Sequence, residues 1–599
     1  MSPVPHALNV AIDDSITVTI EGKMISSGTL KNHIYIYGSQ SGLHLQEGLD
    51  ANRNVEDQTA WVKNFKFKPG ELISVIIKEI VDGDFHLKPY QWQFSVAPES
   101  GTGEFKRREE LYLPPSSEPV SIFAADLNGN DIPDLAVLDG SSGDVSIFAN
   151  RESNMGLGFD KDPVNEIPTP ADNSLALTAY QEDQRTASST NYPHITGGDL
   201  YGNGYSSLMV TSKATDEIII YRNNQDKENE NNDDRINMDD DFYFEPQPIK
   251  TGLQPVMSAV ADFNNDGKMD IAVLGSGNGQ VIIHTNENDF DTTSYQVGNA
   301  PTSLVVRDFN NNGYLDIAVA VSGQDQIDFL ENDQNGGFKD AVSTILDFSP
   351  GPLLAGNFSG SNSDGAPGDD FIELMVGAAN SNRLELYTFD KNTGEFSSKQ
   401  SLDSIEPGPA ANFAAGGFFE KSALDIITAY QGYDHIDLYQ NLGNKEFQSA
   451  SSIDPEPLNG PPFGIGLAVA DFALNGSMDI AVTNSSSNKI TILYNDGGSR
   501  SPPSESGGVT AFPNPFTPND DESNDRTGFN FSDADVHNPV LEIFNFEGRR
   551  IKTVRDLNGE TLFWDGRNDS GKIQLPGVYI YVIKDGSKAI ASGVVTLAR

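Results

Sequence analysis

The stretch AVADFNNDGKMDIAVLG, residues 259–275, carries oxygen-bearing side chains at alternate positions and then turns apolar. With Asp262 as position 1, the donors at positions 1, 3, 5 and 9 are Asp262, Asn264, Asp266 and Asp270. Gly267 follows position 5, where a ring around an ion requires a sharp backbone turn. Calcium takes about six to eight oxygen ligands, so this pattern predicts a calcium-binding loop.

The residues after the loop differ from those of an EF-hand. An EF-hand loop ends with a bidentate Glu at position 12, inside a helix. Here position 12 is Val273, within the β-branched run IAVL, which is typical of a strand. We therefore expect a loop between two strands, closed by Asp270. Asn, Asp and Gly are also ordinary turn formers, so a single copy leaves a plain turn as an equal alternative.

Internal repeats decide between these alternatives, because the pattern recurs along the chain. VVRDFNNNGYLDIAVA (305–320) and FAADLNGNDIPDLAVL (123–138) keep all four donors, although Asp131 replaces the glycine in the latter. AVADFALNGSMDIAVT (468–483) has Ala473 at position 3. The donors in these copies are Asp308, Asn310, Asn312 and Asp316; Asp126, Asn128, Asn130 and Asp134; Asp471, Asn475 and Asp479. Three eroded copies start near residues 199, 357 and 417, so the repeat favours cation loops over accidental turns.

Each copy has the same surroundings. Apolar strands flank the loop, and a third strand follows a Gly/Ser/Asn turn: VSIFAN, IIIYRN, VIIHTN, IDFLEN, LELYTF, IDLYQN and ITILYN. A more polar fourth segment usually comes next, and units one, four, five and six continue into GLGF, NGGF, TGEF and NKEF. Seven such four-stranded units predict an all-β chain with a seven-bladed β-propeller over residues 100–498.

The ring must also close. After ITILYN the chain runs into DGGSRSPPSESGG, so the seventh unit lacks a fourth strand. Residues 102–105 read TGEF, identical to residues 393–396, and EELYLPP follows. We expect residues 104–114 to complete the last blade, because this pairing leaves no free sheet edge.

The repeats resemble FG-GAP/VCBS repeats, which form the propellers of integrin alpha subunits and of many secreted bacterial proteins. VGAAN, residues 376–380, lies where that family has its GAP. The resemblance implies calcium on one face of the disc, at three full loops and an incomplete fourth at Asp471. It adds a backbone carbonyl from position 7, which is Ile132, Lys268 or Tyr314. It places an unidentified ligand on the opposite face, built from residues 139–144, 275–280, 322–326 and 484–489.

Site strength should follow ligand charge. The loop at Asp262 offers three carboxylates, the loops at Asp308 and Asp126 offer two each, and the loop at Asp471 lacks a donor at position 3. We therefore expect cation occupancy in that order.

The amino-acid composition limits the kinds of partner that the chain is expected to bind. The chain has 39 basic and 87 acidic residues, a formal charge of −48, which argues against nucleic acid and anionic membranes. The acidic insertion 225–241 is typical of a solvated loop. Cysteine is absent, so calcium would stabilise an extracellular chain in place of disulfides. No apolar run is long enough to span a membrane. The first residues, MSPVPHALNV, lack a signal-peptide pattern, so we expect a processed form of an exported protein.

Residues 1–99 alternate apolar and polar positions, as in SITVTIEG and LISVIIKEI, which predicts a small β-sandwich. This segment resembles the bacterial Ig-like domains of surface-layer and adhesin proteins. The matching residues are Asp14, Ile16, Pro69, Gly70, Glu71, Tyr90, Trp92 and Phe94. Trp92 and Phe94 are expected in the core.

Residues 499–508 have linker composition, and residues 509–599 form a second β-rich segment. This segment resembles the C-terminal Ig-like domains of proteins exported by type IX secretion, which implies sorting or surface attachment. The matching motifs are PNPF (513–516), WDG (564–566) and PGVY (576–579); PNDD (518–521) replaces the usual PNGDG, so no cation is implied there. We expect Trp564 and Tyr579 in the core and Gly577 in a turn.

No catalytic motif is present. The sequence lacks HExxH, GxSxG and phosphate-loop patterns, and His194 and His284 lie in expected strands as core residues. We expect a secreted or cell-surface, non-catalytic calcium-binding propeller that recognises an extracellular protein or glycan. Two alternatives stay open: a carbohydrate-binding or polysaccharide-degrading propeller, and a structural subunit of a surface layer or filament.

Overall fold

The computed structural model describes the chain in segments that are almost entirely β-strand. They are residues 5, 10, 16–19, 32–44, 50–54, 59–63, 67–82, 85–98, 101, 103–105, 107–114, 117–153, 156–159, 165–167, 193–213, 215–223, 244–286, 290–359, 372–402, 408–419, 424–430, 435–443, 446–453, 466–485, 487–495, 510–512, 526–530, 539–544, 550–555, 561–568, 572–574, 577–585 and 588–597. The chain divides into two compact units, Met1–Gly497 and Gly498–Arg599.

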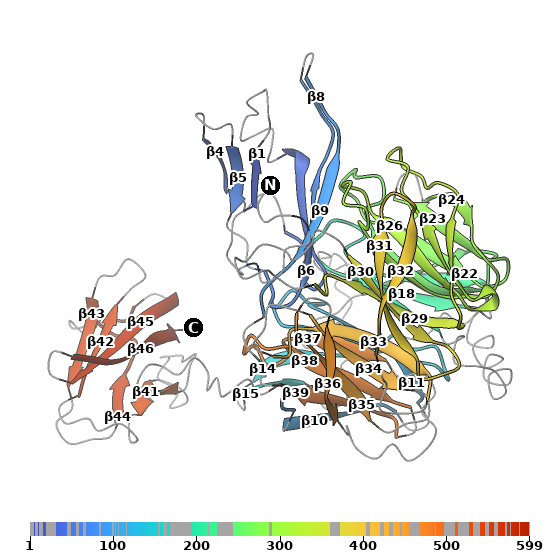
Figure 1. The fold of residues 1–599 in the computed structure, drawn as a ribbon. Coiled ribbons are helices and arrows are strands. Elements are labelled where there is room, and N and C mark those ends of the chain that lie inside the picture. The colour runs from blue at the N-terminus through green and yellow to red at the C-terminus, as the bar shows by residue number, and fades with distance from the viewer. Residues whose placement is uncertain are drawn as a thin grey trace. The chain divides into compact units, whose positions relative to one another are not determined.

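Seven four-stranded antiparallel sheets lie between Arg107 and Tyr494 (Figure 1), and we call them blades one to seven in chain order. Blade one contains β11 (Pro119–Ala125), β12 (Asp134–Asp139), β13 (Val145–Phe148) and β16 (Asn165–Ile167). Blade two contains β17 (Ile195–Gly198), β18 (Ser207–Ser212), β19 (Glu217–Asn223) and β20 (Phe244–Lys250). Blade three contains β21 (Pro255–Ala261), β22 (Asp270–Gly275), β23 (Gln280–Thr285) and β24 (Asp291–Gln296).

The remaining blades repeat this order. Blade four contains β25 (Pro301–Arg307), β26 (Asp316–Val321), β27 (Gln326–Leu330) and β28 (Val342–Ile345), with a 3-10 turn, η2 (Ser322–Gln324), after β26. Blade five contains β29 (Pro350–Gly356), β30 (Glu373–Ala378), β31 (Leu384–Asp390) and β32 (Glu395–Leu402). Blade six contains β33 (Ala410–Gly416), β34 (Asp425–Tyr430), β35 (Ile436–Asn441) and β36 (Phe447–Ile453).

The last blade takes one strand from ahead of the first. It contains β37 (Leu467–Ala470), β38 (Asp479–Asn484), β39 (Lys489–Tyr494) and β10 (Arg107–Tyr112), which pairs antiparallel with β39. This is the pairing that the repeated TGEF predicts. The first strands of neighbouring blades contact one another from β11 through β37, and β37 contacts β11 in turn. The succession is therefore cyclic, as in a propeller.

Burial explains the strand sequences. Every residue of β22 and of β26 is buried, because both faces of these strands pack against neighbouring blades. The outer strand β24, DTTSYQ, is mostly exposed, which matches its polar sequence. The apolar runs that follow each loop are thus the inner strands of the blades.

A Phe before or at the start of the outer strand links blades in five places. Each packs against an aromatic ring in the loop of the preceding blade, at centroid distances of 5.9, 5.5, 5.5, 5.5 and 5.8 Å for Phe105–Phe418, Phe159–Phe472, Phe338–Phe263, Phe396–Phe309 and Phe447–Phe358. In blade one the GLGF segment lies in a separate hairpin, β14 (Asn150–Ser153) with β15 (Gly156–Phe159). The outer strand β16 comes after this hairpin.

The N-terminal part has two sheets and a hairpin. One sheet has the order β1 (Ile16–Thr19), β5 (Thr59–Lys63), β4 (Asp50–Asn54); the other has β3 (Gly42–Leu43), β2 (Ile34–Gly38), β6 (Leu72–Ile77), β9 (Tyr90–Ser95); β7 (Ile80–Asp82) pairs with β8 (Phe85–Leu87). Trp92 and Phe94 are each 1% exposed within its core, as predicted.

The C-terminal unit also has two sheets. They have the orders β40 (Thr510–Phe512), β41 (Thr527–Asn530), β44 (Thr561–Trp564) and β43 (Arg550–Arg555), β42 (Pro539–Phe544), β45 (Gly577–Asp585), β46 (Lys588–Leu597). Trp564 and Tyr579 pack in the core at 5.0 Å, as expected. The predicted turn at Gly577 is wrong, because Gly577 begins β45; Gly566 has the positive φ of 68° instead.

Several predicted features lie outside the described residues. These are the insertion 225–241, the linker 499–508, the PNPF and PNDD motifs, Asp14 and Pro576. Among the described residues, no helix is long and apolar enough to cross a bilayer.

Candidate functional site

The candidate cation loops join the first and second strands of blades one, three, four and seven. They share one backbone conformation, in which positions 4 and 6 have positive φ: 58° and 83° at Asn265 and Gly267, 57° and 86° at Asn311 and Gly313, 76° and 66° at Gly129 and Asp131, 49° and 85° at Leu474 and Gly476. Asp131 adopts the left-handed conformation without a glycine, which short Asp side chains tolerate. The blade-one loop therefore keeps the common conformation.

In the blade-three loop, the oxygens of positions 1, 3 and 5 accept backbone N–H bonds of the loop. Asp262 accepts from Asp266 at 3.2 Å and from Gly267 at 2.7 Å, Asn264 Oδ1 accepts from Asp266 at 2.9 Å, and Asp266 Oδ1 accepts from Lys268 at 2.8 Å. The blade-four and blade-one loops repeat this network on Asp308, Asn310 and Asn312, and on Asp126, Asn128 and Asn130. These bonds turn the oxygens predicted as ligands toward the loop interior.

The position-7 residues are tied to the same network. The N–H groups of Ile132, Lys268 and Tyr314 each donate to the side-chain oxygen at position 5, at 2.8 to 2.9 Å. These bonds hold the peptide group immediately before the one that carries the predicted carbonyl ligand. In the blade-seven loop Asp471 and Asn475 make the corresponding bonds, whereas Ala473 supplies no side-chain oxygen.

The position-9 carboxylate braces the loop. Asp270 Oδ2 accepts the Phe263 N–H at 3.0 Å, and its Oδ1 accepts the N–H of Asn286, just after β23, at 2.7 Å. Asp134 and Asp316 are placed in the same way. Asp479 accepts the N–H of Ala473, one residue further along its loop, and that of Asn495. Both oxygens thus hold loop and third strand together, whether or not a cation is present.

The Asn at the end of the third strand connects neighbouring blades, and sequence analysis missed this role. Its Nδ2 donates to the position-2 carbonyl of the preceding blade: Asn150 to Phe472, Asn223 to Leu127, Asn286 to Leu200, Asn332 to Phe263, Asn441 to Phe358 and Asn495 to Phe418. The signal was visible, because six of the seven third-strand segments end in Asn. Blade five has Phe389 at this position, and its ring packs 5.9 Å from that of Phe309.

Burial makes the loop carboxylates unfavourable as free charges. The pKa of Asp262 lies well above its usual range, first because of burial and then because Asp270 and Asp266 repel it. Burial also raises the pKa of Asp308 to about 6. A divalent cation would offset this cost, so Asp262, Asn264 and Asp266 suit a calcium ion chemically.

The loops do not form all-carboxylate cages. Where the structure describes side chains, it brings no three Asp, Glu, His or Cys residues together as a metal-binding group. A cation in these loops would therefore depend on Asn oxygens and backbone carbonyls as well, which corresponds to a weak site.

The N-terminal domain contacts the end of the blades at which the candidate cation loops lie, which we call the loop end. Tyr37 Oη donates to Gly267 O at 2.9 Å, the Gln91 N–H donates to Gly313 O at 2.9 Å, and the Leu43 N–H donates to Asp199 Oδ2 at 3.1 Å. Asp199 belongs to the eroded loop of blade two. The turns between second and third strands, including residues 139–144 and 275–280, lie at the other end of the blades.

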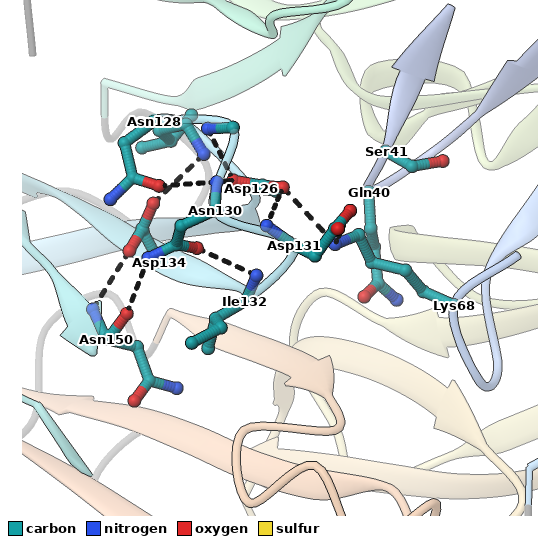
Figure 2. A network of polar contacts seen from close by, with 12 residues as sticks. Gln40, Ser41, Lys68, Asp126, Asn128, Asn130, Asp131, Ile132, Asp134 and Asn150 are labelled. Atoms are coloured by element: carbon teal, nitrogen blue, oxygen red, sulfur yellow. Dashed lines mark hydrogen bonds and ion pairs between the residues drawn. The ribbon is translucent and has the colours of Figure 1, made fainter. Parts of the chain in front are cut away.

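Lys68 of the N-terminal domain reaches into the blade-one loop, as Figure 2 shows. Its Nζ lies 3.3 Å from Asp126 Oδ2 and 4.0 Å from Asp131 Oδ1, and the side chains of Lys68 and Asp126 are only 10% and 8% exposed. The backbone N–H of Asp126 also donates to Gln40 O at 3.0 Å. An ammonium group of the protein itself therefore neutralises the first ligand of this loop.

Family comparisons agree with two of the three resemblances, those of the repeats and of the C-terminal segment. Residues 262–319 match the FG-GAP-like repeat, and residues 510–597 match the CHU_C type IX secretion signal domain. The chain carries an FG-GAP-like repeat and a type IX secretion signal domain. The latter implies a secreted or cell-surface protein. No curated protein matches the chain.

Solved structures similar to this chain cover about two thirds of it. BBS1N in complex with ARL6DN has 14% identity and a TM-score of 0.41, covering 64% of this chain and 94% of its own. Hydrazine synthase of Kuenenia stuttgartiensis has 12% identity and a TM-score of 0.40, covering 64% and 97%. Sqt1 of Saccharomyces cerevisiae has 9% identity and a TM-score of 0.38, covering 66% and 99%. Similarity at this level carries no argument about function.

Proposed function

We propose that this secreted or cell-surface propeller binds calcium in its repeated loops and recognises an extracellular protein or glycan without catalysing a reaction. The observation that carries the proposal is the repeated set of inward-turned oxygens at Asp262, Asn264 and Asp266 and at their counterparts in blades one and four. Calcium would act structurally, by neutralising carboxylates that burial makes costly.

The docking of the N-terminal domain supports a ligand face at the opposite end. Its contacts with Gly267, Gly313 and Asp126 occupy the loop end of the blades. The turns between the second and third strands, at 139–144, 275–280, 322–326, 484–485 and 487–489, lie at the other end, and they are the recognition surface we propose. Loops on a rigid scaffold commonly carry binding residues.

A binding screen on glycan and matrix-protein arrays, with calcium and with chelator, tests the proposal. We expect at least one ligand to bind in calcium and to be lost or weakened in chelator. Release of reducing sugars from a polysaccharide would instead support an enzyme, and ordered polymers in electron micrographs would support a structural subunit. Absence of both calcium binding and ligand binding would contradict the proposal.

A further inference from the structure

A cavity of about 460 Å³ lies between the N-terminal sheet and the first strands of the blades. Strands β2, β6 and β9 contribute lining residues from the N-terminal domain. Strands β11, β17, β21, β25, β33 and β37 contribute from the propeller. The cavity therefore lies at the loop end of the propeller, away from the proposed recognition turns.

The last residues of the seven first strands form a ring, and their side chains explain both the volume of the cavity and its positive charge. The last residue of each first strand pairs with the position-9 residue, and in six blades it is Ala or Gly: Ala125, Gly198, Ala261, Gly356, Gly416 and Ala470. Blade four has Arg307 at this place, opposite Asp316. A single guanidinium thus enters a ring of otherwise small residues and lines the cavity.

Arg307 lacks an anionic partner among the described residues. One guanidinium N–H donates to the Val306 carbonyl oxygen at 2.9 Å. Arg307 is half-buried and lines the cavity. A buried cation without a counter-charge is costly unless a ligand supplies one.

Three glutamines of the N-terminal domain line the same cavity. Gln40, Gln91 and Gln93 are 7%, 1% and 5% exposed. Gln91 has neither amide oxygen nor nitrogen bonded, and the amide oxygens of Gln40 and Gln93 have no partner within the described structure. Gln93 Nε2 donates to Ser74 Oγ at 3.0 Å, which orients that amide. Buried amides are normally paired, so these groups indicate a missing polar partner.

The cavity also borders two carboxylates, but both are engaged. Asp199 accepts backbone N–H bonds from Gly204 and Leu43, and Asp262 accepts them from its own loop. Within the described structure neither carboxylate forms an ion pair with Arg307, whose hydrogen bond goes to the Val306 carbonyl, so the guanidinium remains available to an added anion.

We propose that this cavity binds a small hydroxylated carboxylic acid, such as a hexuronic acid. The carboxylate pairs with Arg307, because a guanidinium offers two parallel donors to it. The hydroxyl groups exchange hydrogen bonds with Gln40, Gln91 and Gln93, because an amide both donates and accepts. This site is separate from the recognition face, and the proposal does not depend on the proposed function.

The test measures binding to the full-length protein by calorimetry, with sodium glucuronate, glucose and sodium sulfate as probes. Arg307→Ala is expected to fold, because three other blades have Ala at the same ring position. Gln93→Leu removes an orphaned acceptor from the other wall. Lys339→Ala is the matched control, since it also removes one positive charge but from a half-exposed pair with Glu331.

We expect glucuronate to bind the wild type, and Arg307→Ala to weaken it about tenfold or more, as loss of a charge-assisted bond requires. Gln93→Leu should weaken glucuronate binding as well, while Lys339→Ala should leave it unchanged. Glucose should bind the wild type less well than glucuronate does, and Arg307→Ala should reduce this difference. Equal binding of sulfate and glucuronate, no glucuronate binding at millimolar concentration, or wild-type affinity in Arg307→Ala overturns the proposal.

Discussion

Replacing Lys68 with Met should show whether an added calcium ion can take the place of the Lys68 ammonium group beside Asp126. Lys68 and Asp126 are both about nine-tenths buried at 3.3 Å, so the substitution leaves Asp126 as an uncompensated buried charge. Removing one partner of such a pair costs about 3–5 kcal/mol of unfolding free energy, which we expect in chelator. In calcium the loop can bind an ion where the ammonium was, and an ion at about 100-fold its Kd returns about 2.7 kcal/mol.

The assay is chemical unfolding with and without calcium. Circular dichroism follows the β-sheet content, and fluorescence follows the tryptophans, which lie at Trp61, Trp92 and Trp564 outside the propeller. Lys339→Met is the control, because its half-exposed pair with Glu331 should contribute about 0–1 kcal/mol in either buffer. A loss below about 1 kcal/mol for Lys68→Met in chelator, or the same calcium-dependent gain in variant and wild type, refutes the reasoning.

Three further predictions concern the propeller. Asn332→Ala removes two buried hydrogen bonds that the side chain donates and one part-buried bond that it accepts. At about 1 kcal/mol each this should cost about 3 kcal/mol in chemical unfolding, against less than about 0.5 kcal/mol for the exposed Asn335→Ala. Asp262→Asn should keep or raise stability in chelator, because it removes a buried charge, and should shrink the calcium-dependent rise in Tm; an unchanged rise contradicts the site. His284→Leu should reduce acid sensitivity: burial lowers the pKa of His284 to about 4, so the wild type loses stability as pH falls below about 6.5, by about 2 kcal/mol at pH 5. Equal pH slopes in variant and wild type would count against this last prediction.

The blades could be predicted from the sequence because their strands and loops are specified by residues that are close together in the chain. The alternation of donors around Gly267 and the apolar run after Asp270 are set by residues a few positions apart, and repetition separates this signal from ordinary turns. The TGEF repeat also predicts the pairing of β10 with β39. The GLGF segment shows the limit of this approach, because it marks the contact of Phe159 with Phe472 while the outer strand comes later, after a hairpin.

The sequence showed the Asn that recurs after the third strand, but it did not show the hydrogen bond that this Asn makes to the preceding blade. Asn150 follows the third strand of its blade, as the corresponding Asn does in other blades, yet its partner, the Phe472 carbonyl, lies 322 residues away. The bond exists because the ring closes, and only the closed ring brings blades one and seven together.

The face of the N-terminal sheet that carries glutamines shows the same limit. Alternation in YQWQFS places Trp92 and Phe94 on one face and Gln91 and Gln93 on the other, which suggests a solvent-facing side for the glutamines. The structure buries both faces, because the glutamine side lies against the propeller.

Side-chain spacing and self-similarity were enough to predict the strands, the repeated oxygen-bearing loops and the strand that completes the last blade. Tertiary structure alone decided that Lys68 neutralises Asp126 and that Arg307 faces three glutamines across a cavity. Such contacts depend on which distant surfaces meet and exclude water. Burial then changes the electrostatic cost of each charge, and no local pattern of residues records that cost.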